Sequence, residues 1–242
     1  MSCKVMGIVN VTPDSFSDGG QFFRPEEAIR RAKNLIADGA DIIDLGGEST
    51  RPGATPISWE EEWERVEPVL EGLKASIRSV SSISVDTYHP ETAEKAIKAG
   101  AHIINCVYPE PIPEMLKLLD GNDDELVMPA SALSTKHQAL STRIYLDPMI
   151  GFNTTREEDV ELLRSIPELA KKGRVLVGAS RKRIVKKLTG EKSSVGKNIG
   201  GNVAIAVWAA IQGASVVRVH DVKETVQALR VIGCLKGREE SK

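Results

Sequence analysis

The sequence predicts a single-domain α/β protein over residues 1–242, folded as a (β/α)8 TIM barrel. Short, nearly continuous apolar runs alternate eight times with amphipathic helical patterns, as in parallel sheets that are buried on both faces. The length of 242 residues is ordinary for one such barrel. Polar residues end nearly every apolar run, where barrel enzymes carry their active sites. An open, doubly wound sheet is the alternative fold.

The first four strand–helix units have clear boundaries. The apolar run 5–11 is stopped by Pro13, and the helical pattern 25–38 is stopped by Gly39. After a strand at 41–45 and a Gly-rich loop, Ser58 can cap a helix whose first turn is acidic, which suits the helix dipole. The third unit is predicted at 82–85 and 90–99, and the fourth at 101–106 and 112–119.

The last four units repeat the alternation, but one is short. Strands are predicted at 125–128, 144–146, 175–177 and 215–219, and helices at 134–142, 157–172, 198–212 and 222–235. Residues 131–143 number only 13, about the minimum for a crossover between parallel strands. The barrel can therefore close, with a gap or a thin wall at the fifth helix. Exposed core there is either covered by a partner subunit or leaves the fold marginally stable.

Composition narrows the range of partners. The chain is 41% hydrophobic and 27% charged, with a net charge of −2. This net charge gives no overall electrostatic attraction to nucleic acid or to membranes. No apolar run is long enough to span a bilayer. Cys3, Cys106 and Cys234 are widely spaced without a CxxC pair, which indicates free thiols in a reducing compartment. We expect a cytoplasmic protein that binds small molecules.

Two acids and an amide form the first group of candidate site residues. Asp86 and Asp147 each end an apolar strand, and Asn105 ends the strand between them. In a barrel these side chains point into the mouth, where they could bind the N–H edge of a fused-ring amide that carries an amino group. Asp44 lies deeper in its strand and is interpreted as a buried acid bonded to the backbone or to a neighbouring loop.

The second group suits an anion. Arg51, Arg218 and His220 are cationic or can become so, and Thr50 and Asn10 add neutral donors. Arg218 and His220 are two residues apart on one strand, so both should face the mouth.

The loop after the seventh strand carries Ser180 and Lys182, at a position where barrels commonly bind phosphate or other ligand groups. The neighbouring basic residues Arg181, Arg183, Lys186 and Lys187 are explained by a solvated start of a helix.

With these residues in view, the chain resembles the dihydropteroate synthase family. The resemblance rests on segments spread over nearly the whole chain: residues 10–20 (NVTPDSFSDGG), 46–54, 84–87 (SVDT), 103–105 (IIN), Asp147-Pro148, 180–182 (SRK) and 218–221 (RVHD). It implies a cytoplasmic transferase of folate biosynthesis that joins p-aminobenzoate to 6-hydroxymethyl-7,8-dihydropterin pyrophosphate and releases pyrophosphate, with Mg²⁺ as cofactor. It also implies a homodimer and a sulfonamide target.

The resemblance also implies a role for each candidate residue. Residues matching Asp86, Asn105, Asp147 and Lys182 hold the pterin in that family, and Ser180 and Lys182 border the p-aminobenzoate pocket. Thr50, Arg51, Arg218 and His220 serve the pyrophosphate, Asn10 serves the metal, and Phe152 contacts substrate. Asp86, Lys182, Arg218 and His220 are expected to be catalytic.

The chain departs from the family pattern in four places. The opening β-hairpin is missing, so the barrel floor must be covered otherwise. The pattern Asp-Pro-Gly-Ile-Gly-Phe-Gly-Lys is Asp-Pro-Met-Ile-Gly-Phe-Asn-Thr at 147–154, Cys106 replaces an acid, and the segment between Asn105 and Asp147 is shortened. A non-catalytic pterin-binding paralogue is therefore one alternative. A tetrahydrofolate-dependent corrinoid methyltransferase is the other, but it would have no pyrophosphate for Arg51 and Arg218 to bind.

Overall fold

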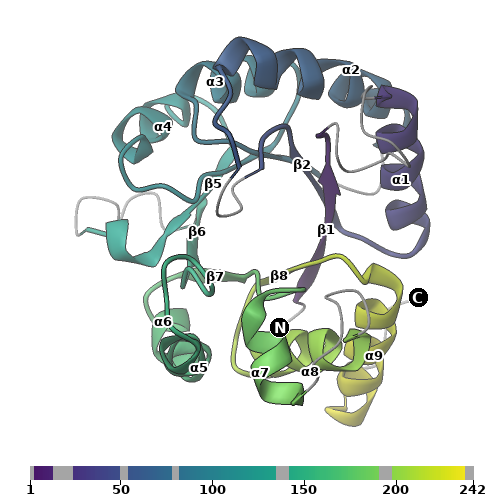
Figure 1. The fold of residues 1–242 in the computed structure, drawn as a ribbon, viewed down its shortest axis with the longest axis vertical. Helices are drawn as coiled ribbons and strands as arrows, with labels where there is room; N and C mark the ends of the chain where they lie inside the picture. Colours follow the sequence, from purple (N-terminus) through teal and green to yellow (C-terminus); the bar gives the residue numbers. More distant parts are fainter. Residues whose placement is uncertain are drawn as a thin grey trace.

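The computed structural model describes residues 3–12, 24–49, 54–77, 82–134, 142–190 and 198–237. Its eight parallel strands form one closed barrel in sequence order, and Figure 1 shows the helices as an outer ring around these strands. The predicted (β/α)8 TIM barrel is confirmed. The strands are β1 (Lys4–Asn10), β2 (Ile42–Gly46), β3 (Ser82–Asp86), β4 (Ile103–Asn105), β5 (Glu125–Pro129), β6 (Ile144–Asp147), β7 (Arg174–Val177) and β8 (Val216–Val219).

The helices follow the strands as predicted in most places. They are α1 (Pro25–Ala37), α2 (Trp59–Ile77), α3 (Pro90–Lys98), α4 (Ile112–Leu118), α5 (Arg156–Arg164), α6 (Ile166–Ala170), α7 (Arg183–Thr189), α8 (Ile199–Ile211) and α9 (Val222–Leu235). The predicted cap of α2 is confirmed, because Ser58 Oγ accepts the N–H of Glu61 over 3.3 Å. None of the described helices has the length and apolar character needed to cross a membrane.

The prediction of one helix over 157–172 is wrong. The structure has α5 and α6 instead, with a break at Ser165. Pro167 explains the break, since it has no N–H to donate and its ring would clash with the carbonyl of Leu163 in a continuous helix. The short helix α7, in the loop after β7, was not predicted as an element.

The predicted short helix at 134–142 falls mostly on residues outside the described ranges. In the described part of this connection, a single 3-10 turn at Ala130–Ala132 follows β5 directly. Arg143, just before β6, donates to the carbonyls of Leu119 and Asn122 over 2.7 and 2.6 Å. These bonds tie the return of the chain to the end of α4.

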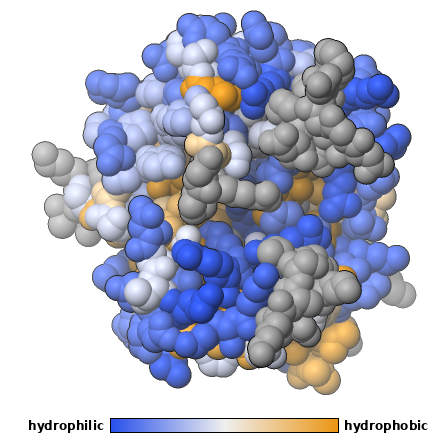
Figure 2. All heavy atoms as spheres, viewed as in Figure 1, coloured by the Kyte–Doolittle hydropathy of each residue, from blue (hydrophilic) through white to orange (hydrophobic). Residues whose placement is uncertain are grey.

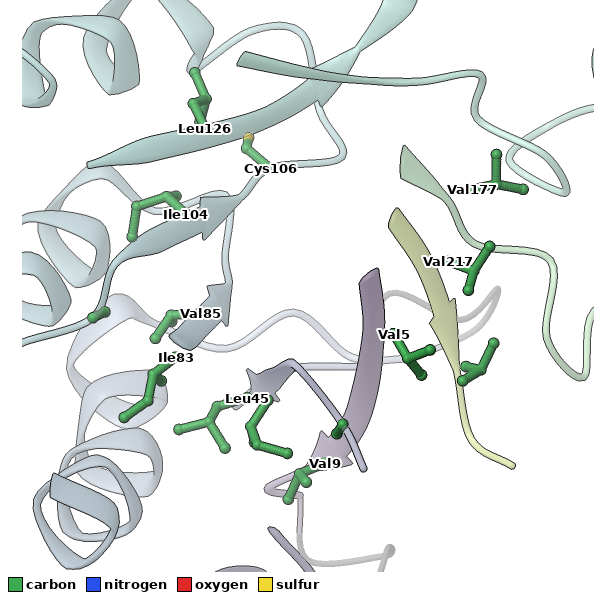
Figure 3. Close-up of a cluster of buried hydrophobic side chains, with 14 of the residues drawn as sticks. Val5, Val9, Leu45, Ile83, Val85, Ile104, Cys106, Leu126, Val177 and Val217 are labelled. Atoms are coloured by element: carbon green, nitrogen blue, oxygen red, sulfur yellow. The ribbon is translucent and has the colours of Figure 1, made fainter. Parts of the chain in front are cut away.

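The main core lies between the barrel and its helices. Alternate strand residues point outward into it, such as Leu45, Val85 and Ile104, which Figure 3 shows among the buried side chains around the strands. Gly7 allows the closest approach of helices to β1, because a Cβ there would lie 3.0 Å from Leu35 and 3.1 Å from Val222. This packing holds the strands in register and so positions their ends.

A second cluster fills the inside of the barrel. It consists of Met6, Ile42, Ile103, Val127, Tyr145, Leu176 and Val216, each at most 1% exposed; we call these residues the barrel plug. Closer to the strand starts, the Arg174 guanidinium lies 3.8 Å from the centre of the Tyr145 ring and bonds to Glu125 and to the Tyr145 hydroxyl. These three side chains lie at the starts of β7, β6 and β5, which form the floor of the barrel.

Candidate active site at the barrel mouth

The mouth begins one layer above the barrel plug. Asp44, Asn105, Asp147 and Arg218 each lie two positions beyond a plug residue on the same strand. Since side chains of a strand alternate between its two faces, all four point into the barrel. The strand registry that sets the plug therefore also brings these four polar side chains together.

Arg218 lies at the centre of this layer. Its Nε donates to Oδ2 of Asp44 over 2.6 Å, and its Nη2 donates to Oδ2 of Asp86 over 2.5 Å. Burial opposes the charge of the guanidinium, but the two carboxylates outweigh burial and raise the pKa of Arg218. The guanidinium thus stays charged and links β8 to β2 and β3, neither of which pairs with β8 in the sheet.

The interpretation of Asp44 as a buried acid is confirmed, but the partners expected for it are wrong. Asp44 is fully buried, and its partners are the side chains of Arg218 and Asn105, whose Nδ2 donates over 3.4 Å. Asp44 is therefore part of the polar layer. The period of two along β2 was the signal for this position, because Ile42 and Asp44 share a face.

Asp86 ends β3 beside Gly46 of β2 and Asn105 of β4. Burial raises the pKa of Asp86 to about 7; Arg218 counteracts this rise, while the charge of Asp44 adds to it. The carboxyl group therefore changes its ionisation state near neutral pH. A group of this kind at a barrel mouth is a functional candidate.

Lys182 approaches the layer from the loop after β7. Its Nζ donates to the carbonyl of Ile150 over 2.6 Å and lies 4.2 Å from the centre of the Phe152 ring. Burial lowers the pKa of Lys182 to about 8, against the attraction of Asp147. Burial likewise raises the pKa of Asp147, and Lys182 opposes that rise. The Asp147 carboxylate also accepts the N–H of Met149 over 2.7 Å.

Ser180 and His220 form a pair at the ends of β7 and β8. Ser180 Oγ lies 3.1 Å from Nδ1 of His220 and accepts the backbone N–H of His220 over 3.2 Å. Arg31 of α1 donates to the carbonyl of His220 over 3.2 Å. The imidazole is thus held at the mouth, next to the strand that carries Arg218.

Three buried polar atoms in the barrel have no hydrogen-bond partner among the described protein atoms: Oδ1 of Asp44, Oγ of Ser84 and Oδ1 of Asn105. They come from neighbouring strands, because Asp44 and Ser84 are register partners and Asn105 ends the next strand. Unpaired buried polar atoms are costly. Their chemistry, two acceptors and one hydroxyl, suits a ligand edge that offers several N–H donors.

Arg181 has a structural role that the sequence did not indicate. It adopts a left-handed conformation with φ 60°, and its Nη2 pairs with Asp221 over 2.7 Å. Asn202 of α8 accepts the N–H of Arg181 and donates to the other Asp221 oxygen, both over 2.9 Å. The residue interpreted as solvated therefore fixes the Ser180–Lys182 loop against the end of β8.

The base of the loop after β2 is also held from neighbouring elements. The Tyr88 hydroxyl donates to Glu48 over 2.7 Å, and His89 lies 3.3 Å from the same carboxylate. Burial and this bond raise the pKa of Tyr88. On the adjacent α2, the buried Glu62 accepts the Thr87 hydroxyl over 2.6 Å. None of these residues was predicted as a site residue.

The remaining predicted residues fall into two sets. Asn10 ends β1 and is the register partner of Gly46, which places it at the mouth. Thr50 and Arg51 lie outside the described residues. Of the predicted set, the structure joins Asp86, Asn105 and Arg218 in one network through Asp44. It places Lys182 against Phe152 and near Asp147, and it pairs Ser180 with His220.

Comparisons with known proteins match nearly the whole chain. The family model described as pterin binding enzyme matches residues 6–140 and 128–220. A curated Staphylococcus haemolyticus protein named dihydropteroate synthase is 39% identical over 262 aligned residues, which cover 99% of this chain and 97% of that protein.

Solved structures are similar over nearly the same span. The Xanthomonas albilineans dihydropteroate synthase with 4-aminobenzoic acid has a TM-score of 0.86 at 39% identity, covering 97% of this chain and 93% of that one. The Burkholderia cenocepacia dihydropteroate synthase complexed with 7,8-dihydropteroate has a TM-score of 0.83 at 32% identity, covering 98% and 92%.

Proposed function

Because this chain belongs to the pterin binding enzyme family, among its dihydropteroate synthases, we propose that it condenses 6-hydroxymethyl-7,8-dihydropterin pyrophosphate with p-aminobenzoate. The products are 7,8-dihydropteroate and pyrophosphate. In this reaction the bond between the pterin methylene and the pyrophosphate oxygen breaks, and its electron pair leaves with the pyrophosphate. The aniline nitrogen then bonds to the methylene carbon and loses a proton.

The polar layer above the barrel plug is the observation that carries this proposal. It combines Asp44, Asn105, Asp147 and Arg218 with the adjoining Asp86, and two of its buried acceptor oxygens have no described protein partner. A pterin presents a ring amide and an amino group, so its N–H edge matches these acceptors. We infer that the acids bind this edge and that the apolar plug forms the floor beneath the ring.

The charges of the site favour the separation of charge in the reaction. Departure of pyrophosphate leaves positive charge on the pterin methylene, which the carboxylates of the layer stabilise. Arg218 and His220 stabilise the departing anion, because they lie together at the end of β8. Lys182, from the loop after β7, holds the pterin. We assign Thr50 and Arg51 to the same anion, on the basis of the resemblance. Ser180, Lys182 and Phe152 border the p-aminobenzoate.

The residues present fit a Mg²⁺ ion whose ligands come largely from the substrate. No cluster of three or more His, Cys, Asp or Glu able to hold a metal occurs among the described residues. Mg²⁺ often keeps several waters and binds through substrate phosphates, so the carboxamide oxygen of Asn10 could add one protein ligand. The ion would neutralise charge on the pyrophosphate.

We also propose a homodimer that buries α8 and α9. The sequence of α8 contains no charged residue, yet Ile199, Trp208 and Ile211 are 40–48% exposed. Val231 and Leu235 of α9 are also exposed, and Figure 2 shows an apolar patch at its lower right, where α9 lies in Figure 1. A helix that is apolar all round is normally buried, and twofold pairing is the commonest way to bury it. Light scattering of Trp208→Glu should show monomers.

The single barrel and the free cysteines support two further parts of the proposal, one domain and a cytoplasmic location. Strands from residue 4 to residue 219 make one barrel, so the chain is proposed to act as one domain. All three cysteines are free, which suits a cytoplasmic enzyme.

The decisive experiment measures pyrophosphate release from the pterin pyrophosphate with Mg²⁺, with and without p-aminobenzoate, alongside calorimetric binding of the pterin. Release that depends on p-aminobenzoate supports the synthase. Tight pterin binding without release would contradict it and favour the non-catalytic paralogue. Inhibition by a sulfonamide would extend the test to the p-aminobenzoate pocket.

A further inference from the structure

The peptide group between Ile150 and Gly151 lies between two charged side chains. Its N–H donates to Oδ1 of Asp159 over 2.6 Å, and its carbonyl accepts Nζ of Lys182 over 2.6 Å. A carboxylate therefore meets the positive end of the peptide dipole and an ammonium group meets the negative end. Both bonds are charge-assisted, which makes them stronger than bonds between neutral groups.

Asp159 is held firmly in this position. It lies in the first turns of α5 and is only 2% exposed. The same Oδ1 accepts the Thr154 hydroxyl over 2.6 Å. A capping box between Thr155 and Glu158 fixes the start of the helix. The carboxylate is thus anchored by a structure that does not itself contact Lys182.

The loop that Asp159 holds has a strained backbone. Met149 and Asn153 adopt left-handed conformations with φ 64° and 54°, and Gly151 between them has φ 77°. Non-glycine residues keep such conformations only where surrounding bonds enforce them. The bonds from Gly151 and Thr154 to Asp159 are bonds of this kind.

The loop in turn determines where Lys182 lies. A Cβ built on Gly151 would come within 2.9 Å of Lys182 Cδ, so the lysine stem rests directly on the glycine. The Phe152 ring and the Ile150 carbonyl then contact its ammonium group. A small rotation of the 150–151 peptide would remove the carbonyl from Lys182.

We propose that Asp159 is a positioning residue for Lys182, which it orients through the Ile150–Gly151 peptide. This inference rests on the proposed function, because it explains how one substrate-binding side chain is placed. Asp159 acts on the pterin site only through Lys182 and does not act on the reacting atoms.

The ionisation of Lys182 offers a readout that a purely structural role would not move. The charged groups that act on Lys182 are Asp147 of β6, Asp86 of β3, Arg218 of β8 and Asp159 of α5. Burial lowers the pKa of Lys182 to about 8, and Asp159 opposes this effect. Loss of the Asp159 charge should therefore lower that pKa further.

The test compares Asp159→Ala, Asp159→Asn and the matched control Glu158→Ala. Glu158 is the next residue and supports the same helix start through Thr155, but it has no contact with the 150–151 peptide. Two quantities are measured for each full-length variant. One is the calorimetric affinity for 6-hydroxymethylpterin, and the other is the pH midpoint of Lys182 acetylation followed by mass spectrometry.

We expect Asp159→Ala to bind the pterin about tenfold more weakly, the usual cost of losing a charge-assisted bond, and to shift the acetylation midpoint to lower pH. Asp159→Asn keeps an acceptor for Gly151 and should stay within about twofold of the parent affinity. Glu158→Ala should lower the melting temperature without changing either quantity.

Unchanged affinity and midpoint in Asp159→Ala would overturn the proposal, as would equal losses of affinity in Glu158→Ala or in Asp159→Asn. The acetylation midpoint requires neither substrate nor turnover. If the parent protein failed to bind pterin, the proposed function would fail while the effect of Asp159 on Lys182 would still be measured.

Discussion

Arg218 of β8 donates to Asp86 of β3 over 2.5 Å, although β1 and β2 separate their strands in the barrel. The sequence placed these residues in two different groups, Arg218 with an anion and Asp86 with a heterocycle. Their contact shows that the guanidinium of Arg218 belongs to both the anion group and the heterocycle group. A ligand phosphate must therefore use the N–H donors of Arg218 that are not directed at Asp44 and Asp86.

Replacing Arg218 should affect both stability and binding. Arg218→Ala leaves the Asp44 and Asp86 carboxylates without their counter-charge, so the free energy of unfolding should fall by about 3 kcal/mol. Urea unfolding measures this loss, and adding Asp44→Asn should recover part of it. Binding of the pterin pyrophosphate should weaken far more than binding of the bare pterin. Equal losses for the two ligands would remove Arg218 from the anion site.

Pterin affinity should depend on pH through Asp86. Burial raises the pKa of Asp86 to about 7, and only the ionised carboxylate accepts two N–H donors from the pterin. Affinity should therefore fall below pH 7, by up to about tenfold per pH unit. Calorimetry between pH 6 and 8.5 checks this, with Asp86→Asn as the variant that loses the dependence. Constant affinity over this range would contradict the prediction.

The raised pKa of Asp86 affects folding stability in the opposite direction, because stability falls where pterin affinity rises. The pKa of Asp86 in the folded protein lies above its ordinary value of 3.8, so the folded state binds more protons between about pH 4 and 7. The contribution of Asp86 to stability is complete below its unfolded pKa and is lost as the pH rises toward 7.

Met149→Gly should stabilise the protein. Met149 has φ 64°, a conformation that costs a non-glycine residue about 1 kcal/mol or more and costs glycine nothing. After the entropy cost of glycine in the unfolded chain, we expect a gain of about 0.5 kcal/mol in urea unfolding. Asn153→Gly is the matched comparison and should gain less, because asparagine tolerates its φ of 54°. A loss of stability in Met149→Gly would show that its side-chain packing outweighs the strain.

The floor of the barrel should contribute to stability without affecting the ligand. Arg174→Ala removes the stacking on Tyr145 and the ion pair with Glu125. The side chains of this ion pair are only 29% (Arg174) and 23% (Glu125) exposed. We expect a loss of about 2 kcal/mol in unfolding free energy and unchanged pterin affinity. Arg164→Ala breaks only an exposed pair with Glu161 and should cost less than about 0.5 kcal/mol. Similar losses in both variants would mean that the floor contacts add nothing.

Much of the fold was predictable because it depends on local patterns. Apolar runs and helical periodicity located all eight strands, and Ser58 and Gly39 marked the ends of their helices. The break between α5 and α6 followed from Pro167, whose effect is also local but was not recognised. The short helix α7 begins in a basic segment, and its 7 residues are too few to show a helical period.

By itself, the sequence determined the alternation of strands and helices and the polar residues at the strand ends, because period and composition are properties of consecutive residues. The tertiary structure alone decided which of those residues meet. Asp44 joins Arg218, Arg181 joins Asp221, and Asp159 reaches the peptide that holds Lys182. These contacts depend on how the strands are staggered when the barrel closes, and the stagger is set by packing of the plug and the helices around it.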